Sequence, residues 1–443
     1  MIRTSSHHFE NNTNIGKVYK LKSVLKEYRR VAKIILNDIW KNGYEFEKTK
    51  KKKIVKTKFS IKDDKLDIPK YLDYNRFNIQ TTLSARLLSS LTTQLVGIIK
   101  STTEKRRRML YVYNKKLSQR KSSKYLKNIL KSKAKTIVKP NLNNIVMEIS
   151  SKNADIQKHK DGYFLKLKSL GICKSINIPI RLNYVDRKWM KQGCTLMNSF
   201  LIGDSVINLR YHKKIVLSPT GTKIIGADQG ERKVLQLSDE QVTPKTCKHG
   251  HSLSSIMDKL CKKKKGSKAF KKVQAHRNNF INWSINQLNV SSNEIKEFRL
   301  EKIVNIRYKN KTSRKRSHWT HAKIERKVRS FCEEREVPFS LQSCAYMSQR
   351  CNKCGLVLKK NRVNGSEDFI CRGCGHKCDA DYNAALNHSC DLFTLPYFFR
   401  MLGLNRTGFY WKQDSVLDLN HKELNVDALG IKYRESLEQS AKN

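Results

Sequence analysis

The sequence has few acidic residues, no long apolar run and no regular cysteine framework. Only 38 of its 443 residues are Asp or Glu against 91 Lys and Arg, which leaves a formal charge of +53. Because about 18 consecutive apolar residues are needed to span a bilayer and none occur together here, a transmembrane helix is excluded. No cleavable signal opens the chain, and we expect a cytoplasmic protein with reduced thiols.

The positive charge far exceeds what solubility requires, and its natural counterion is a polyphosphate. We therefore expect nucleic acid, and no membrane, as the partner. A bias of the genome towards A·T pairs equally explains part of the lysine excess, so charge alone selects no single residue. A hydrophobic content of 38% in 443 residues provides material for two or three domain cores.

Two Cys-x₂-Cys pairs, Cys351/Cys354 and Cys371/Cys374, are separated by sixteen residues. This spacing closes a tetrahedral zinc site, and four thiolates leave no position for water, so the predicted Zn²⁺ is structural. A metal-free loop or two disulfides are the alternatives. The other eight cysteines lack framework spacing, which disfavours disulfides, and Cys378 competes with Cys374 as a ligand only at a poorer spacing.

The first half of the chain changes its hydrophobic period. Apolar residues recur at helical spacing from Leu21 to Ile39 and from Leu83 to Ile98, with a lysine-dense loop at residues 50–53 between them. From about residue 141 to 218 the period becomes two, with strands around 163–167, 176–182 and 199–211. This pattern predicts a small antiparallel barrel, which is either an oligonucleotide-binding surface or a scaffold.

Three carboxylates follow or open elements that read as buried. Asp228 follows the strand-like run Lys223-Ile-Ile-Gly226-Ala, and Glu301 ends the apolar strand around 298–300, where an ordinary core strand would not have a carboxylate. Asp381 opens a helix in the run Asp379-Ala-Asp381-Tyr-Asn383-Ala-Ala-Leu-Asn387. Like charges drawn from distant segments repel one another unless cations hold them. A pair of Mg²⁺ ions about 3.5–4 Å apart fits this need and catalyses phosphodiester hydrolysis.

In chain order, these motifs resemble the split RuvC nuclease and inserted zinc ribbon of the TnpB proteins of insertion sequences and of the miniature type V CRISPR effectors. The residues that carry the resemblance are Gly226-Ala-Asp228-Gln-Gly230, Glu301-x-x-x-Asn305, Ser348-Gln349-x-Cys351-x-x-Cys354-Gly355 and the run from Asp379 to Asn387. The match covers residues 221–390, and upstream only the layout agrees. Gln229 and Met347 depart from the family pattern without removing a metal ligand.

The resemblance implies that Asp228, Glu301 and Asp381 are the catalytic residues, with Asp379 second in rank for the third role. It implies a multidomain α+β fold, a guide RNA and target double-stranded DNA as partners, and a short flanking motif that the protein reads. The expected domains are a first barrel strand (1–15), a helical recognition domain (16–135), an OB-like β-barrel wedge (136–220), an α/β RNase H-like RuvC domain (221–345 and 378–395), an inserted zinc ribbon (346–377) and a C-terminal tail (396–443).

Basic segments provide the candidate nucleic-acid contacts, which are Arg106, Arg107, Arg108, Lys271, Lys272, Arg307, Arg314, Lys315 and Arg316. Tyr308 and Trp319 near the last group suggest a substrate lid on which bases stack; a solvated loop with a capping tryptophan is the alternative. From Trp411 onwards acidic residues balance the basic ones, and we expect a disordered tail or a partner contact.

Three functions from different classes remain open. The first is an RNA-guided DNA endonuclease, the second a guide-dependent DNA-binding repressor that does not cut, and the third a protein-only transposase or resolvase. A repressor of this kind would have lost an acidic ligand, whereas all three are present. The sequence does not separate TnpB from a CRISPR effector. We expect a monomer, with a dimer as the alternative.

Overall fold

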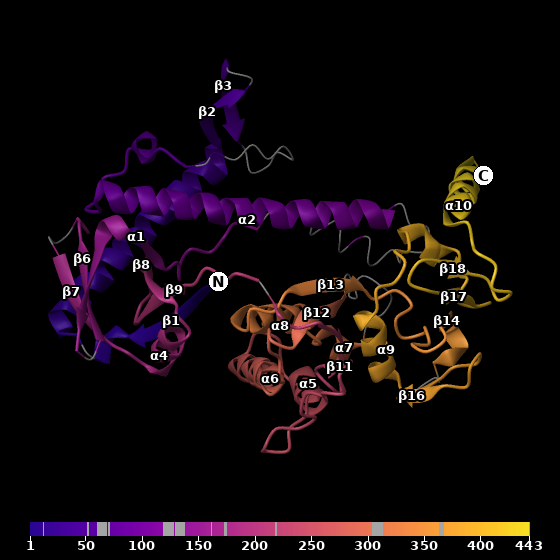
Figure 1. Cartoon of the computed structure of the whole chain (residues 1–443). Coiled ribbons are helices and arrows are strands. Elements are labelled where there is room, and N and C mark those ends of the chain that lie inside the picture. Colours follow the sequence, from indigo (N-terminus) through magenta and orange to yellow (C-terminus); the bar gives the residue numbers. More distant parts are fainter. Residues whose placement is uncertain are drawn as a thin grey trace. The chain divides into compact units, whose positions relative to one another are not determined.

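The computed structural model describes residues 1–443 except 12, 51–52, 60–68, 70, 118–127, 129–137, 161, 172–174, 218, 304–312, 363–366 and 443. The chain forms two compact units, Met1–Lys214 and Ile215–Asn443 (Figure 1). Both mix helices and strands, in agreement with the predicted α+β class. Within the described ranges, every helix is too short or too polar to cross a membrane.

Two long helices, α1 (Ile15–Asn42) and α2 (Ala85–Leu117), supply the core of the first unit. Both predicted apolar stripes face this core, and Tyr28 and Leu91 are fully buried. Of the predicted lysine-dense loop at residues 50–53, Lys50 ends β2 (Tyr44–Lys50) and Lys53 begins β3 (Lys53–Phe59). These two residues lie opposite each other in an antiparallel pair, and residues 51–52 lie outside the described residues.

Besides the β2–β3 pair, the described strands of the first unit form two open antiparallel sheets rather than the predicted small barrel. One has the order β1-β9-β8-β4 and the other β5-β6-β7. Their bounds are β1 Ile2–His8, β4 Met147–Ile149, β5 Ala154–His159, β6 Gly162–Lys168, β7 Ser175–Arg181, β8 Thr195–Ile202 and β9 Val206–His212. The 3₁₀ turn η3 (Ser151–Asn153) makes the break, since β4 ends before it and β5 starts a new sheet after it.

Short elements complete this unit: η1 (Phe9–Asn11), η2 (Tyr74–Phe77) and α4 (Tyr184–Lys191). Asp186 of α4 is fully buried and accepts hydrogen bonds from the Tyr211 hydroxyl at 2.8 Å and from the Asn183 backbone at 2.7 Å. Its side chain also contacts His7 of β1 at 3.1 Å. These bonds satisfy a buried carboxylate and hold α4 on the sheet.

A mostly parallel sheet lies at the centre of the second unit, with the strand order β11-β10-β12-β13. Its strands are β10 (Lys223–Asp228), β11 (Gln236–Leu237), β12 (Ile295–Lys302) and β13 (Phe339–Ser343). β10, β12 and β13 run parallel, and β11 runs antiparallel to β10. The helices are α5 (Leu253–Cys261), α6 (Lys268–Asn286), α7 (Arg314–Ser317), α8 (His321–Glu334) and α9 (Ala380–Ser389).

Alternation along the strands divides this sheet into an apolar and a polar face. Ile225 and Ala227 of β10, with Phe298 and Leu300 of β12, are buried in one core with residues of α5, α6 and α8. The intervening residues of each strand point to the opposite face, which α9 covers. Asp228 and Glu301 therefore lie on the α9 side of the sheet.

The C-terminal residues are folded against the cysteine segment and do not form the predicted detached tail. Strands β14 (Leu356–Val357), β17 (Phe409–Trp411) and β18 (Val416–Leu417) make one sheet, and β15 (Asp368–Ile370) pairs with β16 (Lys377–Asp379). The other elements are η5 (Lys359–Asn361), η6 (Tyr397–Met401) and α10 (Val426–Lys442). Phe399, Phe409 and Trp411 are buried with Val357, so apolar side chains anchor a segment for which charge balance suggested disorder.

Candidate active site and cysteine cluster

Asp228 and Glu301 lie side by side at the ends of two neighbouring parallel strands. Ala227 is paired with Leu300, so the next residue of each strand falls at the same level. The backbone N–H of Gln229 donates to Glu301 Oε1 at 3.1 Å, and its side-chain amide donates to the Glu301 carbonyl at 3.3 Å. Glu301 is 9% exposed. These bonds fix one carboxylate beside the other.

Asp381, in the first turn of α9, lies close enough for its charge to raise the pKa of both strand-end carboxylates, while Asp379 is engaged elsewhere. Asp379 caps the helix, with Oδ1 accepting the N–H groups of Asp381 and Tyr382 at 2.9 and 3.0 Å. Its Oδ2 accepts from the buried Lys233 ammonium at 2.7 Å. Burial raises the pKa of Asp379, but the Lys233 hydrogen bond and the backbone bonds lower it further, and the net pKa is below its ordinary value. This arrangement favours Asp381 over Asp379 as the third site carboxylate.

Burial and neighbouring negative charges raise the pKa of all three carboxylates. Burial is the main cause at Asp228, and the charges of Glu301 and Asp381 raise its pKa further. Burial also raises the pKa of Glu301 to about 7, with Asp381 adding to the shift against the lowering effect of the Gln229 bond. The pKa of Asp381 is raised by burial and by the charge of Asp379. Two cations act against these shifts at Asp381, namely Lys233 and Arg362, whose Nη2 lies 3.9 Å from Asp381 Oδ1. Such a cluster of oxygen donors fits a divalent cation.

His388, near the end of α9, belongs to this cluster and was missed by sequence reasoning. One ligand atom from each of Asp228, Glu301 and His388 lies within 4.8 Å of the others. His388 is 1% exposed, and burial lowers its pKa to about 4. The sequence did contain a signal for His388. Residue 388 is seven positions after Asp381, which is close to two helical turns, so both residues lie on the same face of the helix.

Gly226 allows α9 to approach the sheet closely. A Cβ at this position would lie 2.1 Å from the Ala385 carbonyl oxygen and 2.4 Å from the Ser389 nitrogen. These are backbone atoms, which cannot rotate away. The glycine that precedes Asp228 by two residues is therefore required by helix packing, and the packing carries Asp381 and His388 to the strand ends.

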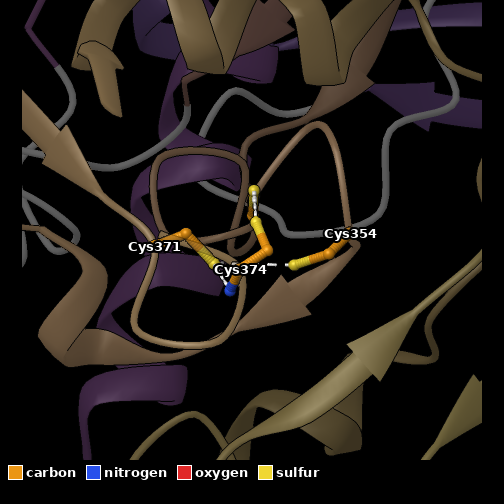
Figure 2. Close-up of side chains that lie close together, drawn as sticks. Cys354, Cys371 and Cys374 are labelled. Carbon is orange, nitrogen blue, oxygen red and sulfur yellow. Dashed lines mark hydrogen bonds between the residues drawn. The ribbon is translucent and has the colours of Figure 1, made fainter. Parts of the chain in front are cut away.

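The four predicted cysteines converge from two similar turns, and Figure 2 shows three of them with their sulfur atoms turned towards one another. The Cys351 and Cys374 Sγ atoms lie 3.7 Å apart, and those of Cys354 and Cys371 lie 3.5 Å apart. A tetrahedron with Zn–S bonds of about 2.3 Å has edges of about 3.8 Å, so the donor set fits zinc. Cys378 is not a member of this set.

Asparagines of α9 attach the cysteine segment to the active-site helix. Asn387 is fully buried and donates to the carbonyls of Met347 and Arg350, both at 2.8 Å, while accepting from Arg350 Nη1 at 2.6 Å. Asn383 donates to the Arg350 carbonyl at 2.8 Å and accepts the Asn352 N–H at 3.1 Å. The asparagines of the sequence motif thus join the two clusters rather than bind a ligand.

The candidate nucleic-acid contacts differ in how exposed they are. Arg107 and Arg108 on α2, Lys271 and Lys272 on α6, and Arg314 are exposed, whereas Arg106 is half-buried. Lys315 pairs with Asp258 at 2.8 Å and donates to the Ser254 hydroxyl at 2.7 Å, so its charge is already partnered. Arg307 lies outside the described residues, as does the Arg316 side chain.

The predicted stacking role of Trp319 does not fit its position. Its side chain lies in the core of the second unit with 9% exposure. A buried indole has no face for a nucleic-acid base, so the capping tryptophan is the better description. Tyr308, the other proposed stacking residue, lies outside the described residues.

Part of the second unit is similar in sequence to known proteins. Residues 321–388 match the family described as Cas12f1-like, TNB domain. The CRISPR-associated endodeoxyribonuclease Cas12f1 of Sulfoacidibacillus thermotolerans is 38% identical over 88 residues, 20% of this chain and 20% of that protein. A TnpB-like protein of Aquifex aeolicus (strain VF5) is 32% identical over 78 residues, 17% of this chain and 26% of that protein. The matched part thus spans about a quarter or less of the length of these relatives.

Solved structures with some likeness include a Cas12f1–sgRNA–target DNA complex, with a TM-score of 0.42 and 13% identity, covering 88% of this chain and 99% of that chain. CasPhi-2 bound to crRNA has a TM-score of 0.31 and 10% identity, covering 51% of this chain and 61% of that chain. Both scores are below 0.5, and nothing about this chain follows from them.

The family match contains all four cysteines, Asp381 and His388, and it confirms the predicted resemblance to TnpB proteins and miniature type V CRISPR effectors.

Proposed function

We propose that this chain is an RNA-guided DNA endonuclease that hydrolyses phosphodiester bonds at a RuvC-type site made by Asp228, Glu301 and Asp381. The observation that carries the proposal is the proximity of these carboxylates, from two strands and a helix, with pKa values that burial and neighbouring negative charges raise. Similarity of residues 321–388 to the Cas12f1-like TNB domain, and of part of the chain to a curated endodeoxyribonuclease, supports it.

The donor chemistry supports two kinds of metal. Clustered carboxylate oxygens suit Mg²⁺, and we propose that Asp228, Glu301 and Asp381 hold a pair of these ions. When bound, such ions supply activation of the attacking water and stabilisation of the leaving 3′ oxygen. The four thiolates of Cys351, Cys354, Cys371 and Cys374 suit a structural Zn²⁺.

The chain's own residues prepare this chemistry. The Gln229 N–H orients Glu301, while Asp379 and Lys233 secure the start of α9 and so hold Asp381 in place. Exposed lysines such as Lys271 and Lys272 on α6 are suited to bind nucleic-acid phosphates. We assign the helices of residues 16–135 to recognition and the sheets of residues 136–220 to the wedge role, with guide RNA and target duplex as partners, in accordance with the formal charge of +53.

Cleavage by active-site variants tests the proposal. The full chain would be purified with its bound RNA and given duplex DNA complementary to the guide, with Mg²⁺. We expect Asp228→Ala and Asp381→Ala to reduce the cleavage rate by about a thousandfold or more, because several kcal/mol of transition-state stabilisation disappear. Guided DNA binding should persist in both variants. Asp414→Ala, which removes an exposed acid, is the matched control and should cleave normally.

Other outcomes identify the other functions. Guided binding without cutting by the unchanged chain would indicate a repressor. Specific binding to element ends by protein free of RNA would indicate a transposase or resolvase. Undiminished cutting by both active-site variants would refute the assignment of the carboxylates. Sequencing of the bound RNA separates TnpB, whose guide overlaps an element end, from a CRISPR effector with repeat-derived guides.

A further inference from the structure

The imidazole of His388 is buried among carboxylates and has no evident structural role. It is 1% exposed, and neither Nδ1 nor Nε2 has a hydrogen-bond partner among the described residues. Buried polar groups are nearly always paired, because leaving a donor or acceptor unpaired away from water costs about 1–3 kcal/mol. An unpaired imidazole beside Asp228 and Glu301 therefore suggests that something else occupies the space between them.

The backbone directs this ring towards the strand ends. Side chains on a helix point back towards its N-terminus, so His388 leans along α9 in the direction of Asp381. Gly226, which lacks a side chain, allows the backbone at His388 to approach β10, with a Cβ there only 2.7 Å from the His388 carbonyl carbon. The result is a set of three possible ligand atoms, from Asp228, Glu301 and His388, all within 4.8 Å of one another.

Two carboxylate oxygens and one imidazole nitrogen form a mixed donor set. Mg²⁺ prefers oxygen ligands alone, whereas imidazole is a ligand for first-row transition ions. Asp381 is not a member of this set of three, although its charge acts on both carboxylates. The set therefore differs in chemistry from a site made only of Asp228, Glu301 and Asp381.

We propose that His388 donates a ring nitrogen to a divalent ion shared with Asp228 and Glu301, and that this ligand makes the site favour Mn²⁺ over Mg²⁺. The inference rests on the proposed function, since it concerns the same carboxylates. It adds a ligand and an ion preference that the carboxylates alone do not provide.

Pulsed electron paramagnetic resonance with Mn²⁺ as the probe tests this directly. The full chain with its bound RNA would be produced with ordinary histidine and with ¹⁵N-labelled histidine. Zn²⁺ is diamagnetic and leaves the Mn²⁺ signal visible. We expect a nitrogen coupling that changes from ¹⁴N to ¹⁵N on labelling, which distinguishes histidine from the base nitrogens of RNA. The coupling should disappear in His388→Leu and His388→Asn, and it should persist in His249→Ala, which changes an exposed loop histidine.

Calorimetry gives a second readout. The ratio of Mn²⁺ to Mg²⁺ affinity should fall by about tenfold or more in both His388 variants, because loss of an outer partner of a metal ligand already weakens binding by that much. Zinc content and melting temperature verify that the variants are folded.

Mn²⁺ bound by the unchanged chain without coupling to a labelled histidine would overturn the proposal, and this measurement needs no variant. A histidine coupling that persists in both His388 variants would also overturn the proposal. The endonuclease assignment would stand in either case if Asp228→Ala still abolished cleavage. If the endonuclease assignment were wrong, the result would be different: Asp228→Ala would cut DNA as fast as the unchanged chain.

Discussion

The cysteine cluster and the carboxylate cluster meet the same helix, α9, but the sequence encodes them in different ways. The four cysteines lie between residues 351 and 374 in two Cys-x₂-Cys turns, and local spacing defines the site. The carboxylates come from β10, β12 and α9, and only the packing of α9 on the sheet brings them together. The cysteine cluster therefore depends on local spacing, whereas the carboxylate cluster depends on the surrounding fold.

The two clusters also differ in the interactions that surround their buried polar groups. The Asn383 and Asn387 side chains form hydrogen bonds with backbone groups beside the cysteines. At the carboxylates, burial and like charges oppose ionisation, and Glu301 has a pKa of about 7. Functional sites often retain such destabilising charges because the chemistry requires them.

Removing a thiolate should have the largest effect. Cys351→Ser takes away one of four ligands, and structural zinc contributes about 10–16 kcal/mol in zinc-finger peptides. We expect zinc content to fall well below one per chain and the free energy of unfolding of residues 215–443 to drop by more than about 5 kcal/mol. Metal analysis and calorimetry would measure this. Cys261→Ser on α5 is the control, and an unchanged zinc content in Cys351→Ser would argue against the site.

Adding a methyl group between α9 and the sheet should have the next largest effect. Gly226→Ala forces backbone atoms apart, and we expect a loss of about 3 kcal/mol of stability with impaired cleavage, at the upper end of overpacking costs. Gly97→Ala is a matched control, because a Cβ at Gly97 meets no described atom within 4 Å and alanine favours the helix. Denaturant unfolding would compare them. Equal stability of the two variants would contradict the close approach of α9.

Breaking the junction between the clusters tests whether they are coupled. Asn387→Ala leaves the Met347 and Arg350 carbonyls without this donor, and we expect a loss of about 2 kcal/mol, within the usual cost of buried unpaired groups. Asn420→Ala, at an exposed position, should change nothing measurable. If zinc binding and cleavage both remained normal in Asn387→Ala while stability fell, the junction would serve stability alone.

Neutralising a site carboxylate should produce the smallest change, and it should be a gain. Burial and the charges of Glu301 and Asp381 raise the pKa of Asp228 in the folded chain, so ionisation of this carboxyl costs folding free energy. The cost begins as the pH rises above the ordinary pKa of the unfolded chain and is complete above the raised pKa. In metal-free buffer, Asp228→Asn should therefore increase the free energy of unfolding, and the gain should grow as the pH rises. Thermal melts would show this, and added Mn²⁺ should stabilise only the unchanged chain. A lower melting temperature in metal-free buffer would contradict the repulsion.

The sequence predicted the parts of the site whose residues belong to a local pattern. Spacing identified Cys351, Cys354, Cys371 and Cys374, and carboxylates at the ends of apolar segments identified Asp228, Glu301 and Asp381. His388 was missed and the predicted stacking role of Trp319 was wrong, because the surroundings of both side chains depend on residues far away in the chain. The folded C-terminal residues were also missed, since charge balance concealed the buried Phe399, Phe409 and Trp411.

By itself, the sequence determined the metal-ligand types, the helical and alternating periods, and the large positive charge, because each is a property of residue identity and spacing. Tertiary structure alone decided that Asp379 binds Lys233 while Asp381 faces the site, that Asn387 joins the two clusters, and that His388 lies beside Asp228. The reason is geometric. A side chain on a sheet or a helix face contacts residues from distant segments, and the sequence does not show which segments will meet.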